Sequence, residues 1–171
     1  MILAIDVAYT ETSAQIAGIV FEHWNSQVFT TQYVIQIDEI ADYESGQFYK
    51  RELPCIFALF NQVKEQISTI VVDGFVYLGE EQKAGLGKHL YDALTHKIPV
   101  IGVAKNPFKG TPKANELLRG ESTKPLYVTA IDIDLDQAKL AISEMHGKHR
   151  IPTLLKLVDQ LSRVKSLNNG A

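Results

Sequence analysis

Two short apolar runs in this chain each end in an aspartate. Residues 2–5 lead into Asp6, and residues 69–72, which are mostly β-branched, lead into Asp73. Such runs are typical of buried strands, and ligands usually bind at the carboxyl ends of strands in open α/β sheets. If the two strands lie side by side, the two carboxylates meet at one edge of the sheet.

Four further groups are candidates to join this pair. Glu52 lies at the start of an apolar helical pattern, Lys105 follows a short apolar run, and Asp132 or Asp134 follows a late one. Carboxylates placed close together repel one another unless a cation neutralises them, and oxygen ligands suit Mg²⁺ or Mn²⁺. Two such ions about 4 Å apart can activate a water and stabilise the leaving oxygen of an in-line displacement, while Lys105 neutralises charge on a phosphate. Phosphodiester hydrolysis is the reaction that these groups serve best.

Each of these groups also has a purely structural interpretation. An aspartate after a strand is common in turns and helix caps, so Asp6 or Asp73 taken singly indicates little. Glu52 is favoured in a first helical turn by the helix dipole alone. Lys105 after a strand is typical of a solvated lysine.

The elements that must position these groups follow from the hydrophobic periodicity. We expect strands at residues 14–21 and 28–35 after the first one, joined by short turns, which makes an antiparallel meander. A helix then begins near Pro54 and is followed by the strand that ends at Asp73. This order predicts an α/β, ribonuclease H-like fold: a mixed sheet with antiparallel strands 1–3 and parallel strands 4–5, flanked by helices. A flavodoxin-like sheet needs a helix between its first two strands, and the turn at residues 10–13 is too short for one.

The rest of the chain alternates in the same way. Gly85 and Gly87 in the first of its helices indicate close approach to a neighbour. The expected elements are a helix at 81–95, a strand at 99–104, a loop at 108–123 with one helical turn near 114–118, a strand at 126–131, and helices at 135–145 and 153–164.

The composition is that of an ordinary globular protein, with 46% hydrophobic and 22% charged residues, and 171 residues fit a single domain spanning 1–171. The single cysteine, Cys55, excludes an internal disulfide and fits a reducing compartment. We expect no signal peptide and no membrane span, and therefore a cytoplasmic protein. Residues 1–75 carry 10 acidic and 3 basic residues, whereas residues 76–171 carry 10 and 14. Carboxylates for metal in one half and lysines for phosphate in the other would produce this asymmetry, as would ordinary solvated faces.

Several segments together resemble the endonuclease V family of deaminated-purine repair nucleases. They are residues 5–9, 43–54 with Arg51-Glu52 before Pro54, 71–74, and 99–105, and the likeness runs to about Pro152. The resemblance implies a ribonuclease H-like fold and a magnesium-dependent nuclease that recognises inosine in DNA or RNA and cuts the second phosphodiester on its 3′ side.

The resemblance also implies roles for individual residues. Asp6, Glu52 and Asp73 fall on the metal-binding carboxylates of the family, and Lys105 falls on its phosphate-contacting lysine. Tyr43 falls on the aromatic wedge that replaces stacking when the damaged base is flipped out. The implied site residues are, in full, Asp6, Glu52, Asp73, Lys105 and Asp132 for catalysis, with the four carboxylates as metal ligands, and Tyr43, Gly46, Gly74 and Lys105 for substrate binding.

The chain departs from the family pattern in two places. Residues 75–82 stand where the family usually has a histidine and glycine and then histidine-proline-arginine, and they belong to the loop that helps to enclose the base. Near the late strand the glycine-histidine-arginine of the family is replaced by Ala130, Ile131 and Asp132, which leaves both Asp132 and Asp134 as fourth-ligand candidates. Two alternatives therefore stay open: a binding module for nucleic acid or a partner on the same scaffold, and a nuclease for another nucleic-acid structure.

Overall fold

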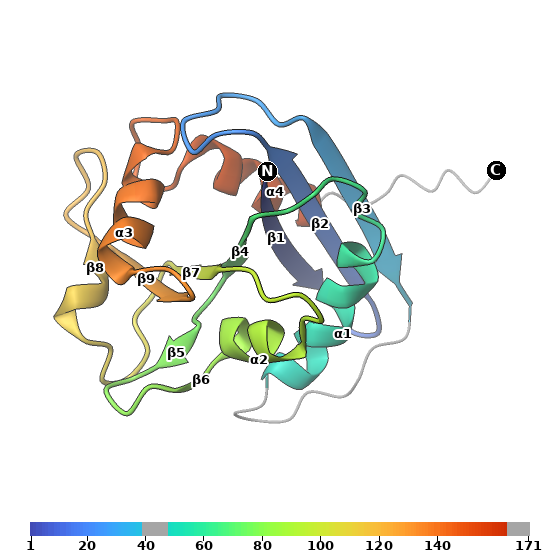
Figure 1. The fold of residues 1–171 in the computed structure, drawn as a ribbon, viewed down its shortest axis with the longest axis horizontal. Coiled ribbons are helices and arrows are strands. Elements are labelled where there is room, and N and C mark those ends of the chain that lie inside the picture. The colour runs from blue at the N-terminus through green and yellow to red at the C-terminus, as the bar shows by residue number, and fades with distance from the viewer. Residues whose placement is uncertain (39–47, 164–171) are drawn as a thin grey trace.

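The core of the molecule is one seven-stranded sheet, seen in the computed structural model (Figure 1), which describes residues 1–38 and 48–163. The strand order is β3-β2-β1-β4-β7-β9-β8. Strands β1, β2 and β3 form an antiparallel meander, β4 and β7 run parallel to β1, and β9 is antiparallel to β7. The expected ribonuclease H-like arrangement of strands 1–5 is confirmed, with the Asp6 strand central and the Asp73 strand beside it. The bounds are Ile2–Tyr9 (β1), Ala14–Phe21 (β2), Thr31–Ile37 (β3), Thr69–Asp73 (β4), Val100–Ala104 (β7), Glu116–Leu117 (β8) and Leu126–Ile131 (β9).

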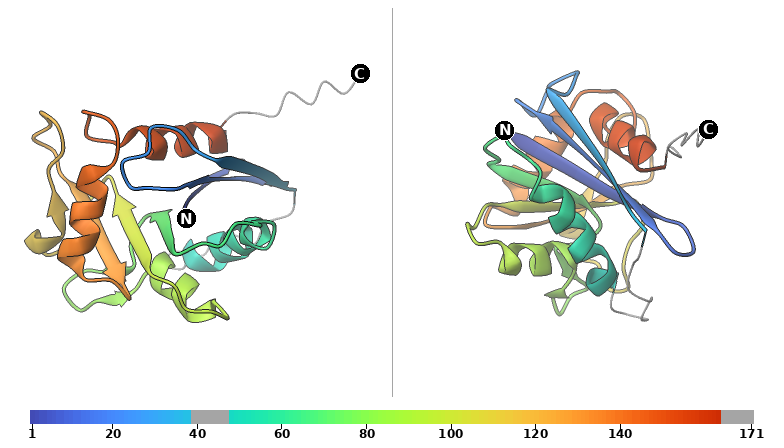
Figure 2. Two further views of the ribbon diagram at one scale, coloured as in Figure 1. Left: turned by 45° about the horizontal axis from the view of Figure 1, so that its top comes forward. Right: turned by 90° about the vertical axis from the view of Figure 1, so that its right-hand side faces the viewer.

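Helices cover both faces of this sheet (Figure 2). Alternate residues of β1 point to opposite faces, so Leu3 and Ile5 pack toward α1 (Phe48–Phe60) and α2 (Leu86–Ala93). Ile2 and Ala4 pack toward α3 (Leu135–Glu144) and α4 (Thr153–Arg163). Both cores are fully buried, so β1 is closed to solvent on its two faces until its carboxyl end. None of the helices in the described residues is long and apolar enough to cross a membrane.

Two helix boundaries differ from the sequence predictions. Helix α1 begins at Phe48, a turn and a half before Pro54, which lies inside it. A proline is tolerated best in a first turn, but the packing of an apolar stripe can outweigh the loss of its one hydrogen bond. Helix α2 begins only at Leu86, because the preceding residues form a hairpin of β5 (Tyr77–Leu78) and β6 (Lys83–Ala84).

The glycine pair at the start of α2 has the predicted role. A Cβ on Gly85 would lie 2.5 Å from the carbonyl oxygen of Phe75, and one on Gly87 would lie 2.7 Å from Val76. The close approach lets the backbone N–H groups of both glycines donate to the carbonyls of Val76 and Phe75, respectively. The segment after Asp73 is thereby fastened to α2.

A buried arginine fixes the connection between α3 and α4. Arg119 is 5% exposed, and its guanidinium donates to four backbone carbonyls at distances of 2.6–3.3 Å. Those carbonyls belong to Met145, Gly147, His149 and Arg150. The carbonyl of Met145 is buried and the other three are partly buried, so one side chain provides donors for most of the connection between the two helices.

Replacing this arginine should destabilise the protein strongly. We expect Arg119→Met to lower the free energy of unfolding by roughly 2–4 kcal/mol, because it leaves buried carbonyls without donors. Urea unfolding measures the change. Lys139→Met is the matched control, since Lys139 donates to a single exposed carbonyl, that of Ala114, and should cost less than about 1 kcal/mol. Equal stability of the Arg119 variant and the wild type would contradict this account of the loop.

Candidate active site

Asp6 and Asp73 lie at the same level of two neighbouring parallel strands. Ile5 pairs with Val72 in the β1–β4 register, so the next residue of each strand is the aspartate. Asp73 in turn pairs with Val103 of β7. The sequence prediction that the two acids meet at one sheet edge is confirmed.

Asp6 is the most deeply placed of these carboxylates, with 8% of its surface exposed. Its Oδ1 accepts a hydrogen bond of 2.8 Å from the backbone N–H of Val7. Burial, and then the charge of Asp73, raise the pKa of Asp6 to about 8. The metal-free protein at neutral pH therefore holds a proton on Asp6.

Asp73 lies at the mouth of the site rather than inside it. Its side chain is exposed, so water screens its charge more than that of Asp6. Partial desolvation by the surrounding protein raises the pKa of Asp73, and the positive charge of Lys105 opposes this rise. Gly74, next in the chain, has φ +130° and donates from its N–H to the carbonyl of Val103 at 3.1 Å. The chain turns at Gly74 immediately after it delivers the carboxylate.

Glu52 reaches the same edge from the interior of α1. Burial, followed by the charge of Asp73, raises the pKa of Glu52 to about 7, and the neighbouring Arg51 opposes the rise. Arg51 itself lies over the ring of Tyr9, with 3.9 Å between the guanidinium carbon and the ring centroid. Glu52 and Asp73 therefore lie close enough for their charges to repel.

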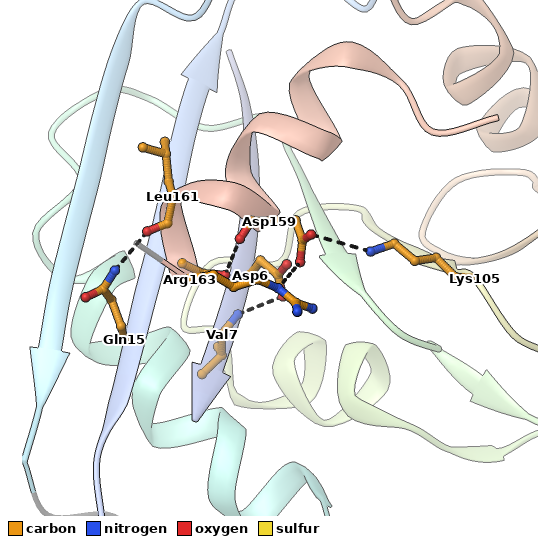
Figure 3. Close-up of polar contacts among 8 residues, drawn as sticks. Asp6, Val7, Gln15, Lys105, Asp159, Leu161 and Arg163 are labelled. Atoms are coloured by element: carbon orange, nitrogen blue, oxygen red, sulfur yellow. Dashed lines mark hydrogen bonds and ion pairs between the residues drawn. The ribbon is translucent and has the colours of Figure 1, made fainter. Parts of the chain in front are cut away.

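A fourth acid, Asp159, was missed by the sequence analysis and comes from α4 (Figure 3). Its carboxylate shares a hydrogen bond with Asp6, and it lies 3.9 Å from the Nζ of Lys105 and 3.0 Å from the Nε of Arg163. Burial opposes ionisation, but the hydrogen bond with Asp6 and the two cations outweigh it and lower the pKa of Asp159. Asp6 and Asp159 thus form a pair that shares one proton, with the charge on Asp159.

Lys105 is brought to this cluster as predicted. It follows β7, the strand beside β4, and about two fifths of its side chain is exposed. Its charge acts on both Asp73 and Asp159. A cavity opens at these groups, and its polar lining consists of Asp6, Asp73, Lys105 and Asp159.

The structure does not bring Asp132 to the site, and the prediction that it completes the carboxylate set is wrong in its geometry. Strand β9 runs antiparallel to β7, so Ile131 pairs with Val100 at the far end of that strand. Asp132 is therefore about six strand residues, roughly 20 Å, from the level of Lys105. There it accepts a hydrogen bond of 3.4 Å from the hydroxyl of Tyr91. Asp134, the alternative, precedes α3 at the same end.

Two predicted substrate-binding residues, Tyr43 and Gly46, lie outside the described residues.

The oxygen atoms of this cluster fit a divalent cation. The carboxyl groups of Asp6, which is buried, and of Glu52, which is half-buried, have raised pKa values, and a cation bound to their oxygens would displace their protons. Within residues 1–38 and 48–163, however, no three His, Cys, Asp or Glu side chains already stand in a geometry that would hold a metal ion. Lys105 and Arg163 balance the charge of Asp159 at this site.

Comparison with known proteins agrees with this architecture. A family model described as endonuclease V matches residues 1–130. Endonuclease V of Thermococcus kodakarensis is 28% identical over 162 residues, which cover 94% of this chain and 76% of that protein.

Solved structures show the same fold. The crystal structure of endonuclease V from Streptomyces avermitilis matches with a TM-score of 0.75 at 26% identity, over 95% of this chain and 79% of that one. Endonuclease V of Ciona intestinalis, crystallised with a 24mer DNA containing an inosine followed by a ribo-adenosine, matches with a TM-score of 0.76 at 19% identity, over 95% and 83%. At that identity the likeness shows the fold alone. Because the family model matches residues 1–130, well over half of the sequence, the chain belongs to the endonuclease V family.

Proposed function

We propose that this protein is a magnesium-dependent endonuclease that hydrolyses a phosphodiester near a deaminated purine, inosine, in DNA or RNA. The observation that carries the proposal is the placement of Asp6 and Asp73 at one level of adjacent strands, with Lys105 beside them. Two carboxyl groups held side by side repel each other when both are ionised, and at least one of them, Asp6, is buried, so such an edge is kept for chemistry rather than for packing. Membership in a nuclease family supports the same conclusion.

The carboxylates would hold the cation. Asp6, Asp73 and Glu52 offer oxygen ligands from three elements, and Asp159 takes the place that the sequence analysis gave to Asp132. When bound, Mg²⁺, or Mn²⁺ as a substitute, supplies Lewis acidity toward the phosphate and a more acidic water. Because these ligands must be ionised, cation binding displaces the proton shared by Asp6 and Asp159.

Lys105 would act on the phosphate directly. Its exposed side chain extends at the mouth of the cavity, between Asp73 and Asp159. A fixed cation at this position stabilises the charge that develops on the phosphate oxygens during the displacement. The site thus combines carboxylate oxygens, which would bind the metal ion, with the ammonium group of Lys105, which would bind the phosphate.

The substrate is inferred from relatives. The Ciona protein was crystallised with inosine-containing DNA, and Tyr43, Gly46 and Gly74 fall on substrate-contacting positions of the family motifs. In this chain the residues after Gly74 form the β5–β6 hairpin, with Val76 buried and its N–H bonded to the hydroxyl of Thr129 at 2.8 Å. This ordered hairpin replaces the histidine-containing loop of the family, so DNA, RNA and branched or flapped strands all belong in a substrate screen.

The compartment that we propose is the cytoplasm. Cys55 is buried in α1 as a free thiol, with 2% of its surface exposed. A chain that gains no disulfide from oxidation fits a reducing compartment.

Cleavage of an inosine-containing strand tests the proposal. With Mg²⁺ present, we expect the wild type to cut labelled inosine-containing DNA or RNA, and Asp73→Asn, Glu52→Gln and Asp159→Asn each to lower the single-turnover rate by roughly 10²- to 10³-fold. Asp132→Asn is the matched control, because it makes the same chemical change at the opposite end of the sheet, and its rate should stay within about threefold of the wild type.

The same screen separates the alternatives. Binding of the strand by the wild type without cleavage would favour a nucleic-acid-binding module on the same scaffold. Cleavage of branched or flapped strands but of no inosine-containing strand would favour another substrate. A rate that falls with Asp132→Asn and not with Asp73→Asn would contradict the site assignment itself.

The stability of the metal-free protein should depend on pH in a direction set by Asp6. The pKa of Asp6 is raised to about 8 in the folded state, whereas the unfolded state releases this proton near the ordinary aspartate pKa of 3.8. Folding is therefore favoured at low pH, and this contribution is lost as the pH rises from about 4 to 8. In EDTA, Asp6 should lower the free energy of unfolding of the wild type by about 4 kcal/mol between pH 5 and pH 8.5, and Glu52, whose pKa is raised to about 7, adds to this fall.

Asp6→Asn should flatten this dependence, because an amide can donate to Asp159 at every pH and carries no charge. Urea unfolding at four pH values measures the two slopes, with Asp132→Asn expected to follow the wild type. If the Asp6 variant loses as much stability as the wild type over this range, the buried proton on Asp6 is disproved.

A further inference from the structure

Arg150 donates hydrogen bonds to backbone carbonyls beside the candidate active site. It is neither one of the carboxylates that would hold the cation nor the lysine that would contact the phosphate. Its Nε donates to the carbonyl oxygen of Lys124 at 3.0 Å, and its Nη2 donates to the carbonyls of Pro125, at 2.8 Å, and of Lys105. All three acceptors are backbone groups. One guanidinium thus joins the segment that follows β7, the segment that precedes β9, and the α3–α4 connection on which Arg150 itself lies.

These contacts connect the segment that carries Lys105 with the segment that leads into α4, the helix of Asp159. The carbonyl of Lys105 belongs to the residue whose Nζ lies 3.9 Å from Asp159. Arg150 precedes α4 by three residues, and α4 carries Asp159 two turns later. Ile151 and Pro152 separate Arg150 from α4, so the contacts of Arg150 hold the short segment from which α4, and with it Asp159, starts. The backbone of Lys105 is fastened to the same point.

We propose that Arg150 is a positioning residue, which fixes Lys105 relative to Asp159 and thereby aims the lysine at the scissile phosphate. This inference rests on the proposed function, since it assigns Arg150 a part in that same site. A planar guanidinium can hold several carbonyls in fixed directions, and an ammonium group cannot. The effect therefore depends on the shape of the side chain and not only on its charge.

Arg119 provides an internal comparison. It also donates only to backbone carbonyls, but all four lie within residues 145–150. Among the described residues it makes no hydrogen bond to Lys105. Loss of Arg119 loosens the loop as a whole, whereas loss of Arg150 releases Lys105.

A double-mutant cycle between Arg150 and Lys105 tests the proposal. With Mg²⁺ and an inosine-containing strand, Arg150→Ala should lower kcat by roughly 30-fold with KM changed less than about threefold, since a misplaced group can cost up to about 10²-fold. Arg150→Lys, which keeps the charge, should not restore kcat. In the Lys105→Ala background, Arg150→Ala should lower kcat by no more than about twofold further, because two residues that act as a unit are not additive. Lys139→Met is the matched control, since Lys139 donates to the carbonyl of Ala114, and it should change kcat by less than about twofold in both backgrounds.

Additive effects of Arg150→Ala and Lys105→Ala would overturn the proposal, as would recovery of kcat in Arg150→Lys. Absence of cleavage by the wild type would instead count against the proposed function, and a second readout then decides on Arg150 alone. Lysines labelled by reductive ¹³C-methylation give one NMR signal each, and loss of a signal in Lys105→Arg identifies that of Lys105. This signal should move to the position of solvated lysines in Arg150→Ala and stay in place in Lys139→Arg. An unmoved Lys105 signal in Arg150→Ala would also overturn the proposal.

Discussion

Like charge held at the end of two neighbouring strands is the constraint on which this structure depends. Asp6 and Asp73 follow two buried apolar strands in register, so the β1–β4 pairing holds the backbones of the two residues side by side. The raised pKa of Asp6 favours its uncharged form, which reduces the repulsion, and Lys105 and Arg163 stabilise the charge of Asp159. A bound cation can neutralise the same carboxylates in place of the proton and the basic side chains. A cluster of acids that destabilises the metal-free fold can therefore serve a function.

The rest of the fold keeps these groups at a fixed distance from one another. Strand β1 is packed on both faces, so its end is a rigid base. Helix α4 lies across the strands and brings Asp159 over Asp6 (Figure 3), and its starting point is held by the carbonyl contacts of Arg119 and Arg150. Two of the arginines in the basic half of the chain therefore bind backbone carbonyls. Phosphate binding can explain only part of the charge asymmetry of the sequence.

The sequence was sufficient for the central part of the site and not for its periphery. Apolar runs that end in Asp6 and Asp73 carry a strong local signal, because a buried strand and its exposed end are both visible in the residue types. The prediction that Asp132 joins the site was wrong because hydrophobic periodicity indicates that a strand exists but not its direction. Strand β9 is antiparallel to β7, so its carboxyl end lies at the opposite edge of the sheet. The start of α1 differs from the prediction because Pro54 favours a first helical turn but lies inside α1, where packing outweighs that preference.

Asp159 shows what kind of signal was overlooked. It is the sole acid within α4 and stands beside the buried stripe of Leu154, Val158 and Ser162. An isolated acid at the border of an apolar stripe is a weak signal, since most such residues are simply solvated. Only the crossing of α4 over β1, a tertiary contact between residues far apart in the chain, gives it meaning.

The most direct test of a cation-holding edge is a crystal structure grown with Mn²⁺, with the ion located by its anomalous scattering. The account predicts a manganese peak within about 2.0–2.6 Å of carboxylate oxygens of both Asp6 and Asp73, with Glu52 or Asp159 contributing further oxygens. A peak at Asp132, or none between Asp6 and Asp73 at millimolar Mn²⁺ and pH 8.5, would contradict it.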